Sequence, residues 1–554
     1  MKRTLLALAA GLAHVAMTLA ATAPGNGAVD AAIEREAAKA WERPAVVVSD
    51  RRPWVREFYE AAAYAPAWFT PGGARPAAAA ALEQLRAADR RGLDPADYGV
   101  DRLAAKVAAA SAATRTPEIV AGADVALTAA MLRFLTDLHD GRVRPQAVAP
   151  HFRKPVTDPG FDAKLRAAIA GDRIAALTDA AEPSFPLYAR LKRLLAQYRS
   201  LAAQPLPPLP LLPGKRTKIA PGETWEGIAA LHDHLRLLGD LPGGVERPAD
   251  NRYAEPLVAA VTRFQDRHGL APDGVLGRAT IAELSVPLRQ RVDQITLSLE
   301  RLRWLPELPP GPMIAVNIPS FRLWAFADAR APDRPVLAMP VIVGRAVRTE
   351  TPLFIGDMRY VEFSPYWNVP PNILRNEILP ALRRDPAYLQ RHDMELVRTG
   401  RDRSITTTVD AAALAALESG ALRVRQRPGP RNALDGIKFV LPNTMDIYLH
   451  GTPAPALFKP ARRDFSHGCI RVADPAALAR FVLRDQPEWT AARIEAAMAA
   501  GTMTTVTLQG SIPVVVFYTT AIAAADERAL FLPDVYGHDR KLEAALRAAR
   551  AGSR

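Results

Sequence analysis

The sequence predicts a multidomain α+β protein with a helical N-terminal region, a small three-helix module and a C-terminal β-rich domain that carries a helical insertion. The chain has 554 residues, too many for one ordinary hydrophobic core. Apolar residues recur every three or four positions through most of the first 300 residues, which is typical of amphipathic helices. After residue 312, short apolar runs bounded by Gly, Pro and Asn predict strands instead.

Composition and charge narrow the classes of partner. The chain is 49% hydrophobic and 23% charged, as in globular proteins, and its net charge is +13. A positive net charge favours binding to polyanions such as nucleic acid, anionic lipid or an acidic wall polymer. A general excess of arginine in the composition would give the same net charge without such a partner. No block of Lys and Arg with interleaved aromatic residues occurs, so we expect no nucleic-acid partner.

Residues 1–23 have the layout of an export signal. Lys2 and Arg3 precede an apolar run, and small residues follow, with a cleavage site predicted after Ala20. The run is short for a spanning helix, so the segment is interpreted as a signal peptide or an uncleaved membrane anchor. No later segment looks transmembrane, and we expect the rest of the chain to be exported.

Residues 30–212 are predicted to be a helical scaffold domain, with amphipathic helices over 77–93 and 123–143. They contain no polar constellation that indicates chemistry. A proline-rich stretch over 203–216 marks the boundary to the next unit, 217–288. That unit resembles the peptidoglycan-binding three-helix module. The motif positions are Phe264, Gln265, Gly269, Leu270, Asp273, Gly274, Gly277 and Thr280, interpreted mainly as architecture.

A connecting helix and linker are predicted over 289–311, and a β-rich domain over 312–525. The short, regularly spaced strands favour a sandwich or a barrel. Residues 371–434 interrupt the domain as a helical insertion, interpreted either as a lid or as a plain surface excursion. Residues 526–554 form a C-terminal extension.

Cys469, in "SHGCIR", is the only cysteine of the chain. An exported chain with one cysteine cannot form an internal disulfide, so the thiol is either inert or reactive. A strand predicted over 444–452 places Met445, Ile447 and Leu449 on the core side. Asp446, Tyr448 and His450 then lie on the polar side.

Three interpretations of this cysteine remain open from spacing alone. In the first, His450 or His467 activates the thiol, His450 being better placed at a strand end, and backbone amides near Gly468 hold an oxyanion. In the second, the thiol is buried and inert. In the third, Cys469, His467, His450 and Asp464 bind zinc, although no paired CxxC motif is present.

The motifs "HG" at His450, "SHGCIRV" at Ser466, "VNIPSFRLW" at Val316, "TPLF" at Thr351, "FSPYWNVPPNI" at Phe363 and "DVYGHD" at Asp534 together resemble L,D-transpeptidase catalytic domains. With the helical region, the module and the insertion, the whole chain resembles large periplasmic L,D-transpeptidases of diderm bacteria. Ser364 departs from the pattern, which has Asn there, and puts one loop hydrogen bond in doubt.

The resemblance implies a cysteine acyltransferase that needs no metal and no cofactor. Its expected substrate is peptidoglycan, with a tetrapeptide donor stem, a second acceptor stem and a 3–3 cross-link between them. It implies Cys469 as nucleophile, His450 as base, the Gly451 carbonyl as its orienting group, and the amides of His467, Gly468 and Cys469 as the oxyanion hole. The expected substrate-binding side chains are Arg471, Tyr448, Trp367 and Ser466.

Two alternatives remain at this stage. The same chemistry with another acceptor would make the protein an L,D-carboxypeptidase or a lipoprotein-attaching enzyme, and a dead domain would leave a non-catalytic peptidoglycan-binding protein. We expect a periplasmic monomer, either soluble or anchored to the inner membrane by an uncleaved signal, whose thiol reacts with carbapenems.

Overall fold

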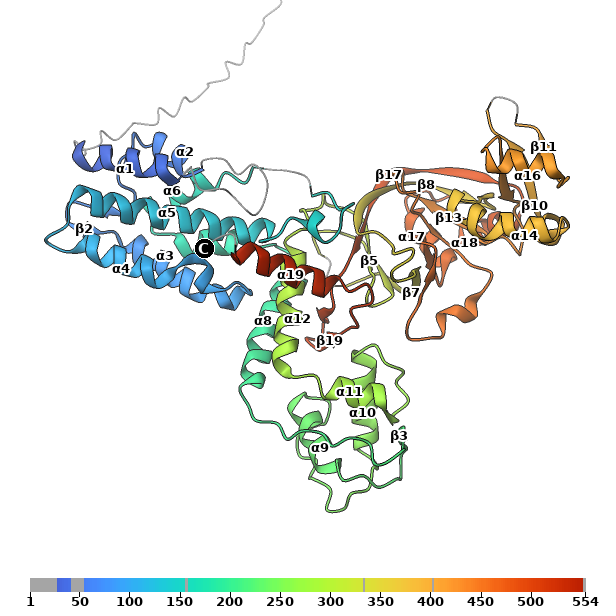
Figure 1. Cartoon of the computed structure of the whole chain (residues 1–554), viewed down its shortest axis with the longest axis horizontal. Coiled ribbons are helices and arrows are strands. Elements are labelled where there is room, and N and C mark those ends of the chain that lie inside the picture. Colours follow the sequence, from blue (N-terminus) through green and yellow to red (C-terminus); the bar gives the residue numbers. More distant parts are fainter. Residues whose placement is uncertain (1–26, 41–53, 155–157, 332–333, 401–402, 552–554) are drawn as a thin grey trace, which may run out of the picture.

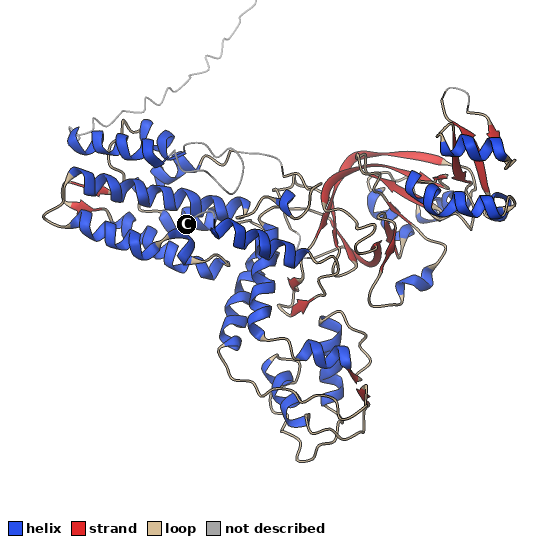
Figure 2. Ribbon diagram, in the orientation of Figure 1, coloured by secondary structure: helices blue, strands red, loops and turns tan. Residues whose placement is uncertain are grey.

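The computed structural model describes residues 27–40, 54–154, 158–331, 334–400 and 403–551. The predicted signal, residues 1–23, lies outside them. Figure 1 shows a helical region at one end, the β-rich domain at the other, and a small helical module that projects from the helices between them. Figure 2 shows that the strands are concentrated in the C-terminal half, as the sequence predicts.

The N-terminal region is helical and has its own core, which includes Phe58, Trp68 and Phe134. Its helices are α1 (Gly27–Ala40), α2 (Trp54–Glu60), α3 (Pro76–Arg86), α4 (Val100–Ser111), α5 (Pro117–Asp140), α6 (Phe161–Ala170), α7 (Ile174–Ala180) and α8 (Pro186–Ala202), with a short hairpin of β1 (Phe69–Thr70) and β2 (Gly73–Ala74).

Helix α5 differs from the prediction that no segment after the signal resembles a transmembrane helix. By length and composition it could cross a membrane, although we predicted no such segment after the signal. Its apolar residues are mostly buried, and it packs against α1 and α4, as expected of a central core helix.

The small module contains the three predicted helices, α9 (Ile228–Leu237), α10 (Leu257–Arg267) and α11 (Arg278–Leu284), with the short strands β3 (Lys218–Ile219) and β4 (Leu276–Gly277). Its motif residues bond to one another. Gln265 is buried, donates to Asp273 at 2.9 Å and accepts from the Gly274 amide at 2.8 Å. These contacts agree with the interpretation of the motif as architecture.

Helix α12 (Leu288–Leu302) is bound to the scaffold region through buried charged side chains. Glu300 and Arg303 form an ion pair at 3.0 Å, and both side chains are almost fully buried. Arg303 also donates to the hydroxyl of Tyr188 on α8, and Glu300 accepts from the Val143 amide at 3.0 Å. The helix is therefore tied to the scaffold region by several charge-assisted hydrogen bonds.

Within the described residues, nine strands of the C-terminal domain form one sheet, and a pairing between β6 and β7 closes eight of them into a barrel. The strands are β5 (Met313–Asn317), β6 (Arg322–Phe326), β7 (Leu337–Gly344), β8 (Phe354–Phe363), β13 (Ile437–Val440), β14 (Leu449–His450), β15 (Asp464–Ser466), β16 (Ile470–Val472) and β17 (Thr504–Phe517). Helix α17 (Pro475–Val482) packs against β7, and helix α18 (Ala491–Ala499) packs against α17. The barrel alternative of the sequence prediction is the one observed.

The insertion is partly helical, as predicted, but it also contains a four-stranded sheet that the sequence analysis missed. It has its own apolar core around Leu382, Leu396 and Val424. Its elements are β9 (Trp367–Asn368), α13 (Pro371–Ile373), a π-helical turn (Leu374–Ile378), α14 (Leu379–Arg384), α15 (Tyr388–Arg391), β10 (Met394–Arg398), β11 (Ile405–Thr406), α16 (Ala411–Glu418) and β12 (Leu422–Gln426).

The C-terminal segment folds back onto the barrel and α12. It contains β18 (Ala521–Ala523), β19 (Ala529–Phe531) and α19 (His538–Ala551). Figure 1 shows α19 lying beside α12, at the junction of the scaffold and the barrel. Tyr536 of this segment contacts Gly344 and Thr351, and Thr351 contacts the loop that carries Cys469.

Candidate active site

The register of two parallel strands brings the predicted residues together. Leu449 on β14 pairs with Ile470 on β16, and His450 pairs with Arg471. Leu449 and Ile470 are fully buried in the barrel core. Because side chains alternate along a strand, His450 and Arg471 lie on the opposite face. Tyr448 and Cys469, each one residue before the paired segment, continue that face, so the imidazole lies diagonally across from the thiol.

The strand that we predicted over 444–452 is wrong for most of its length. Only Leu449 and His450 are in strand conformation. The Asn443 side chain accepts from the amides of Met445 and Ile447, and Asp446 has a positive φ of 55°, so the chain turns there. His450 still lies on the face opposite Leu449, as predicted, but this face is covered, since His450 is only 4% exposed.

His450 is neutral in this environment. Burial, and secondarily the guanidinium of Arg471, lower the pKa of His450 to about 3. The backbone of Gly451 acts against this shift, but Nδ1 is buried and forms no hydrogen bond of regular geometry with another described residue. The predicted orienting hydrogen bond to the Gly451 carbonyl is thus not formed with regular geometry.

Gly451 is needed for close packing. A Cβ atom at this position would lie 2.6 Å from Oδ2 of Asp435. The Gly451 amide also donates to the Ile437 carbonyl at 3.2 Å, which holds the chain just after His450.

Cys469 is a protonated thiol. Burial raises its pKa above the ordinary value, although the backbone and hydroxyl of Tyr448 and the charge of Lys438 act against this shift. Its Sγ donates to the Asp446 carbonyl at 3.5 Å. The thiol of Cys469 and the imidazole of His450 are therefore both neutral at pH 7.

Tyr448 contacts the thiol of Cys469 on one side and the side chain of Trp367 on the other. Burial raises the pKa of Tyr448, as does its contact with Cys469, while Trp367 on β9 lowers it. The rings of Tyr448 and His450 are 5.6 Å apart. Tyr448 therefore contacts Cys469, His450 and Trp367.

Lys438 belongs to this cluster, and the sequence analysis missed it. It pairs with His450 across β13 and β14, its Nζ lies 4.7 Å from the centroid of the Tyr448 ring, and it forms an ion pair with Glu362 at 3.1 Å. Its charge lowers the pKa of both Cys469 and His450. A lysine between apolar residues in "GIKFV" was the available signal.

Arg471 is the group best suited to an anionic ligand. Its Nε is buried without a hydrogen-bond partner among the described residues, and burial lowers the pKa of its guanidinium. The residue as a whole is partly exposed, but a buried guanidinium nitrogen without a partner is unfavourable unless an anion binds it. Arg471 can therefore bind a substrate carboxylate by donating hydrogen bonds to it.

The second histidine, His467, is close to Cys469 in the sequence, but its side chain pairs with a residue of the insertion. His467 Nε2 lies 2.7 Å from Oε1 of Glu377, in the π-helical turn of the insertion. Ser466, predicted to bind substrate, instead uses its hydroxyl inside the loop, donating to the Cys469 carbonyl at 2.6 Å and accepting from the Gly468 amide at 3.1 Å.

The predicted oxyanion hole is reduced to two amides in this conformation, because the Gly468 amide is engaged by Ser466. The amides of His467 and Cys469 make no hydrogen bond to another described residue. Ser364, the departure from the family pattern, donates to the carbonyls of Ala497 and Met498 at the end of α18.

Among the described residues, no group of three or more His, Cys, Asp and Glu side chains is arranged to hold a metal ion. Of the residues in the zinc alternative, His467 pairs with Glu377, and Asp464 pairs with Arg462 at 2.6 Å.

Comparison with known proteins assigns three parts of the chain. Family profiles match residues 53–195 as a scaffold domain, 226–284 as a "Putative peptidoglycan binding domain" and 311–516 as an L,D-transpeptidase catalytic domain. A "Putative L,D-transpeptidase" of Haemophilus influenzae is 31% identical over 281 residues, which are 50% of this chain and 55% of that protein. The chain thus spans about half the length of this relative.

A crystal structure of an L,D-transpeptidase from Xylanimonas cellulosilytica is similar at 16% identity, over 55% of this chain and 100% of that chain, with a TM-score of 0.17.

Proposed function

We propose that this chain, which carries the L,D-transpeptidase catalytic domain together with a scaffold domain and a peptidoglycan-binding domain, cross-links peptidoglycan stem peptides through Cys469. The observation that carries the proposal is the β14–β16 register, which puts the base candidate His450 on the same face as the chain's single thiol. The unpaired guanidinium of Arg471 supports a substrate that bears carboxylates.

The first step acylates the enzyme. Sγ of Cys469 attacks the carbonyl carbon at the L-centre of meso-diaminopimelate in a tetrapeptide donor, and the thiol proton passes to His450. The amides of His467 and Cys469 stabilise the tetrahedral oxyanion. The C–N bond to the terminal D-alanine then breaks, and the proton moves from His450 to the leaving amine.

The second step transfers the acyl group. The side-chain amine of diaminopimelate in a second stem attacks the thioester, the C–S bond breaks, and the amine proton returns through His450 to the thiolate. The product is a 3–3 cross-link. The contact of Glu377 with His467 supports the insertion as a lid over this step. We place the reaction in the periplasm, with residues 1–23 as signal peptide or anchor.

Mass spectrometry of muropeptides after incubation with the protein tests the proposal. The expected product is the 3–3 dimer, and Cys469→Ala should abolish it without changing the thermal unfolding temperature. Dimer formation by that variant would contradict the mechanism. Tripeptides alone would indicate water as acceptor, and failure of a carbapenem to label the thiol would favour a non-catalytic binding protein.

A further inference from the structure

The loop from Ser466 to Cys469 has peptide groups that alternate in direction. The Ser466 carbonyl accepts from the Thr349 hydroxyl at 3.0 Å and from the Arg345 amide at 3.0 Å. The Gly468 carbonyl accepts from the Thr351 hydroxyl at 2.7 Å. Both carbonyls therefore point at the same short segment, residues 349–351.

The peptide group between them is turned the other way. The Gly468 amide donates back to the Ser466 hydroxyl. Gly468 has a φ of 121°, which favours glycine, and this backbone conformation permits the reversal.

The direction of the two unpaired amides follows from these bonds. In a trans peptide the carbonyl of one residue and the amide of the next point in opposite directions. Because the carbonyls of Ser466 and Gly468 are held against residues 349–351, the amides of His467 and Cys469 both point away from that segment, on one side of the loop.

We propose that the hydroxyls of Thr349 and Thr351 are positioning groups that aim the amides of His467 and Cys469 into a two-donor oxyanion hole; this rests on the acyl-transfer function proposed above. Neither threonine contacts the substrate. Each acts by holding the carbonyl whose peptide group carries the donor amide, so that both donors are preorganised before charge develops on the substrate oxygen.

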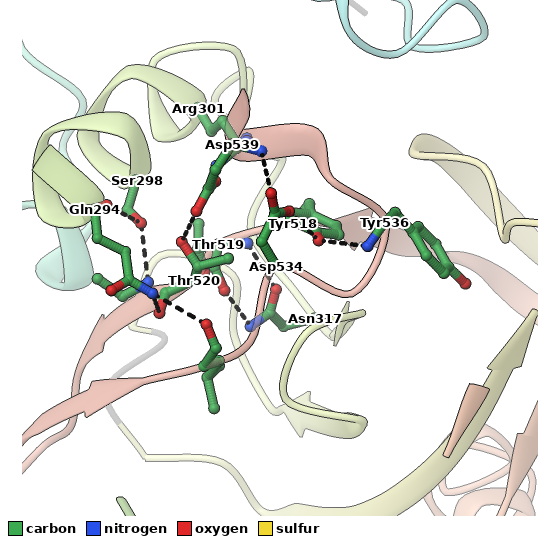
Figure 3. A network of polar contacts seen from close by, with 12 residues as sticks. Gln294, Ser298, Arg301, Asn317, Tyr518, Thr519, Thr520, Asp534, Tyr536 and Asp539 are labelled. Carbon is green, nitrogen blue, oxygen red and sulfur yellow. Dashed lines mark hydrogen bonds and ion pairs between the residues drawn. The ribbon is translucent and has the colours of Figure 1, made fainter. Parts of the chain in front are cut away.

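The C-terminal segment fixes Thr351 in turn. The buried Tyr536 hydroxyl donates to the Gly344 carbonyl at 2.6 Å and accepts from the Thr351 amide at 3.2 Å. Figure 3 shows how this tyrosine is held: its amide donates to the Tyr518 hydroxyl at 3.0 Å, and Tyr518 donates to Asp534 at 2.6 Å.

The same network reaches the connecting helix. The Asp539 amide donates to Asp534 at 3.1 Å, and the Asp539 carboxylate forms an ion pair with Arg301 of α12 at 2.5 Å. The positioning groups thus depend on residues beyond 516, where the match to the catalytic-domain family ends.

Two reactions of the same thiol separate positioning from general damage. Acylation by a carbapenem develops an oxyanion, whereas alkylation by iodoacetamide displaces iodide at a methylene carbon and does not. In the full chain, Thr351→Val should lower the acylation rate roughly 10- to 100-fold and leave the alkylation rate nearly unchanged. Thr351→Ser, which keeps the hydroxyl, should restore most of the acylation rate.

If Thr351→Val folds poorly, two other variants give the same comparison of acylation with alkylation. Thr349→Val changes a less buried threonine, and Tyr536→Phe removes the hydroxyl that accepts from the Thr351 amide. Thr178→Val is the matched control, because its buried hydroxyl also donates to a carbonyl, that of Ile174 at 2.9 Å, but within the scaffold. It should change neither rate.

Acylation that stays at the wild-type rate in both valine variants would overturn the inference, as would equal loss of both reactions in the valine and serine variants. If the wild-type protein is alkylated but is acylated neither by the carbapenem nor by a tetrapeptide stem, the proposed function itself fails. That result is independent of the threonines.

Discussion

The neutral resting state of the site predicts how the thiol responds to pH. Burial raises the pKa of Cys469 above the ordinary 9.0 and lowers that of His450 from 6.5 to about 3. The second shift disfavours the imidazolium by about 5 kcal/mol. A thiol with a pKa of 9.0 is about 1% ionised at pH 7, so Cys469 should be less ionised than that. A thiolate–imidazolium pair would be almost fully ionised, which makes it about 100-fold more reactive.

Iodoacetamide alkylation between pH 5 and 10, followed by intact-protein mass, measures this directly because Cys469 is the only cysteine. The rate should rise about tenfold per pH unit to above pH 9, without a step near 6.5, since His450 does not titrate there. His450→Gln should keep the same alkaline limb, and N-acetylcysteine is the reference thiol. A plateau from pH 5 to 8 would refute the neutral-pair interpretation.

Three further predictions concern single contacts. Lys438→Met should raise the pKa of Cys469 further and slow alkylation at pH 8, whereas Glu362→Gln, which keeps the lysine, should not. Glu377→Gln should speed amide hydrogen exchange over residues 371–378 by loosening the contact with His467, with Glu418→Gln in the same insertion as control. Glu300→Gln should lower the free energy of unfolding by about 3–5 kcal/mol, because it leaves a buried arginine uncompensated, while the exposed Glu527→Gln should change it by less than about 1 kcal/mol.

Some elements around the site have clear local signals. Asp474 followed by Pro475 is typical of a helix start, and at the start of α17 the Asp474 side chain accepts from the Ala477 amide. The choice of His450 over His467 as partner of the thiol also came from strand position. It agrees with the β14–β16 register, although the catalytic roles remain proposals.

What local signals could not predict are the contacts made over long sequence separations. Thr349 and Thr351 are each 117 residues from the carbonyl they hold, and Glu377 is 90 residues from His467. Strand β10 was missed because its residues do not alternate between apolar and polar, and Glu395 is buried among them. Strand β12 does alternate, with Leu422 and Val424 buried and the arginines between them partly exposed, and this signal was overlooked. Their pairing is decided by the insertion's own core and by the ion pair between Glu395 and Arg425.

Arg471 allows the recognition step to be tested apart from the reactivity of the thiol. If its guanidinium binds a substrate carboxylate, Arg471→Met should remove charge-assisted hydrogen bonds worth about 1.5–3 kcal/mol, or roughly 10- to 100-fold in kcat/KM for the tetrapeptide. Removing this cation should also raise the pKa of His450, because Arg471 is one of the groups that lower it. The variant's iodoacetamide rate at pH 8 should fall much less than kcat/KM, because the guanidinium attracts the Cys469 thiolate but alkylation needs no carboxylate contact. Arg471→Lys keeps the charge without the planar fork and should fall between the two. Unchanged kcat/KM in Arg471→Met would show that the Arg471 guanidinium does not bind a substrate carboxylate.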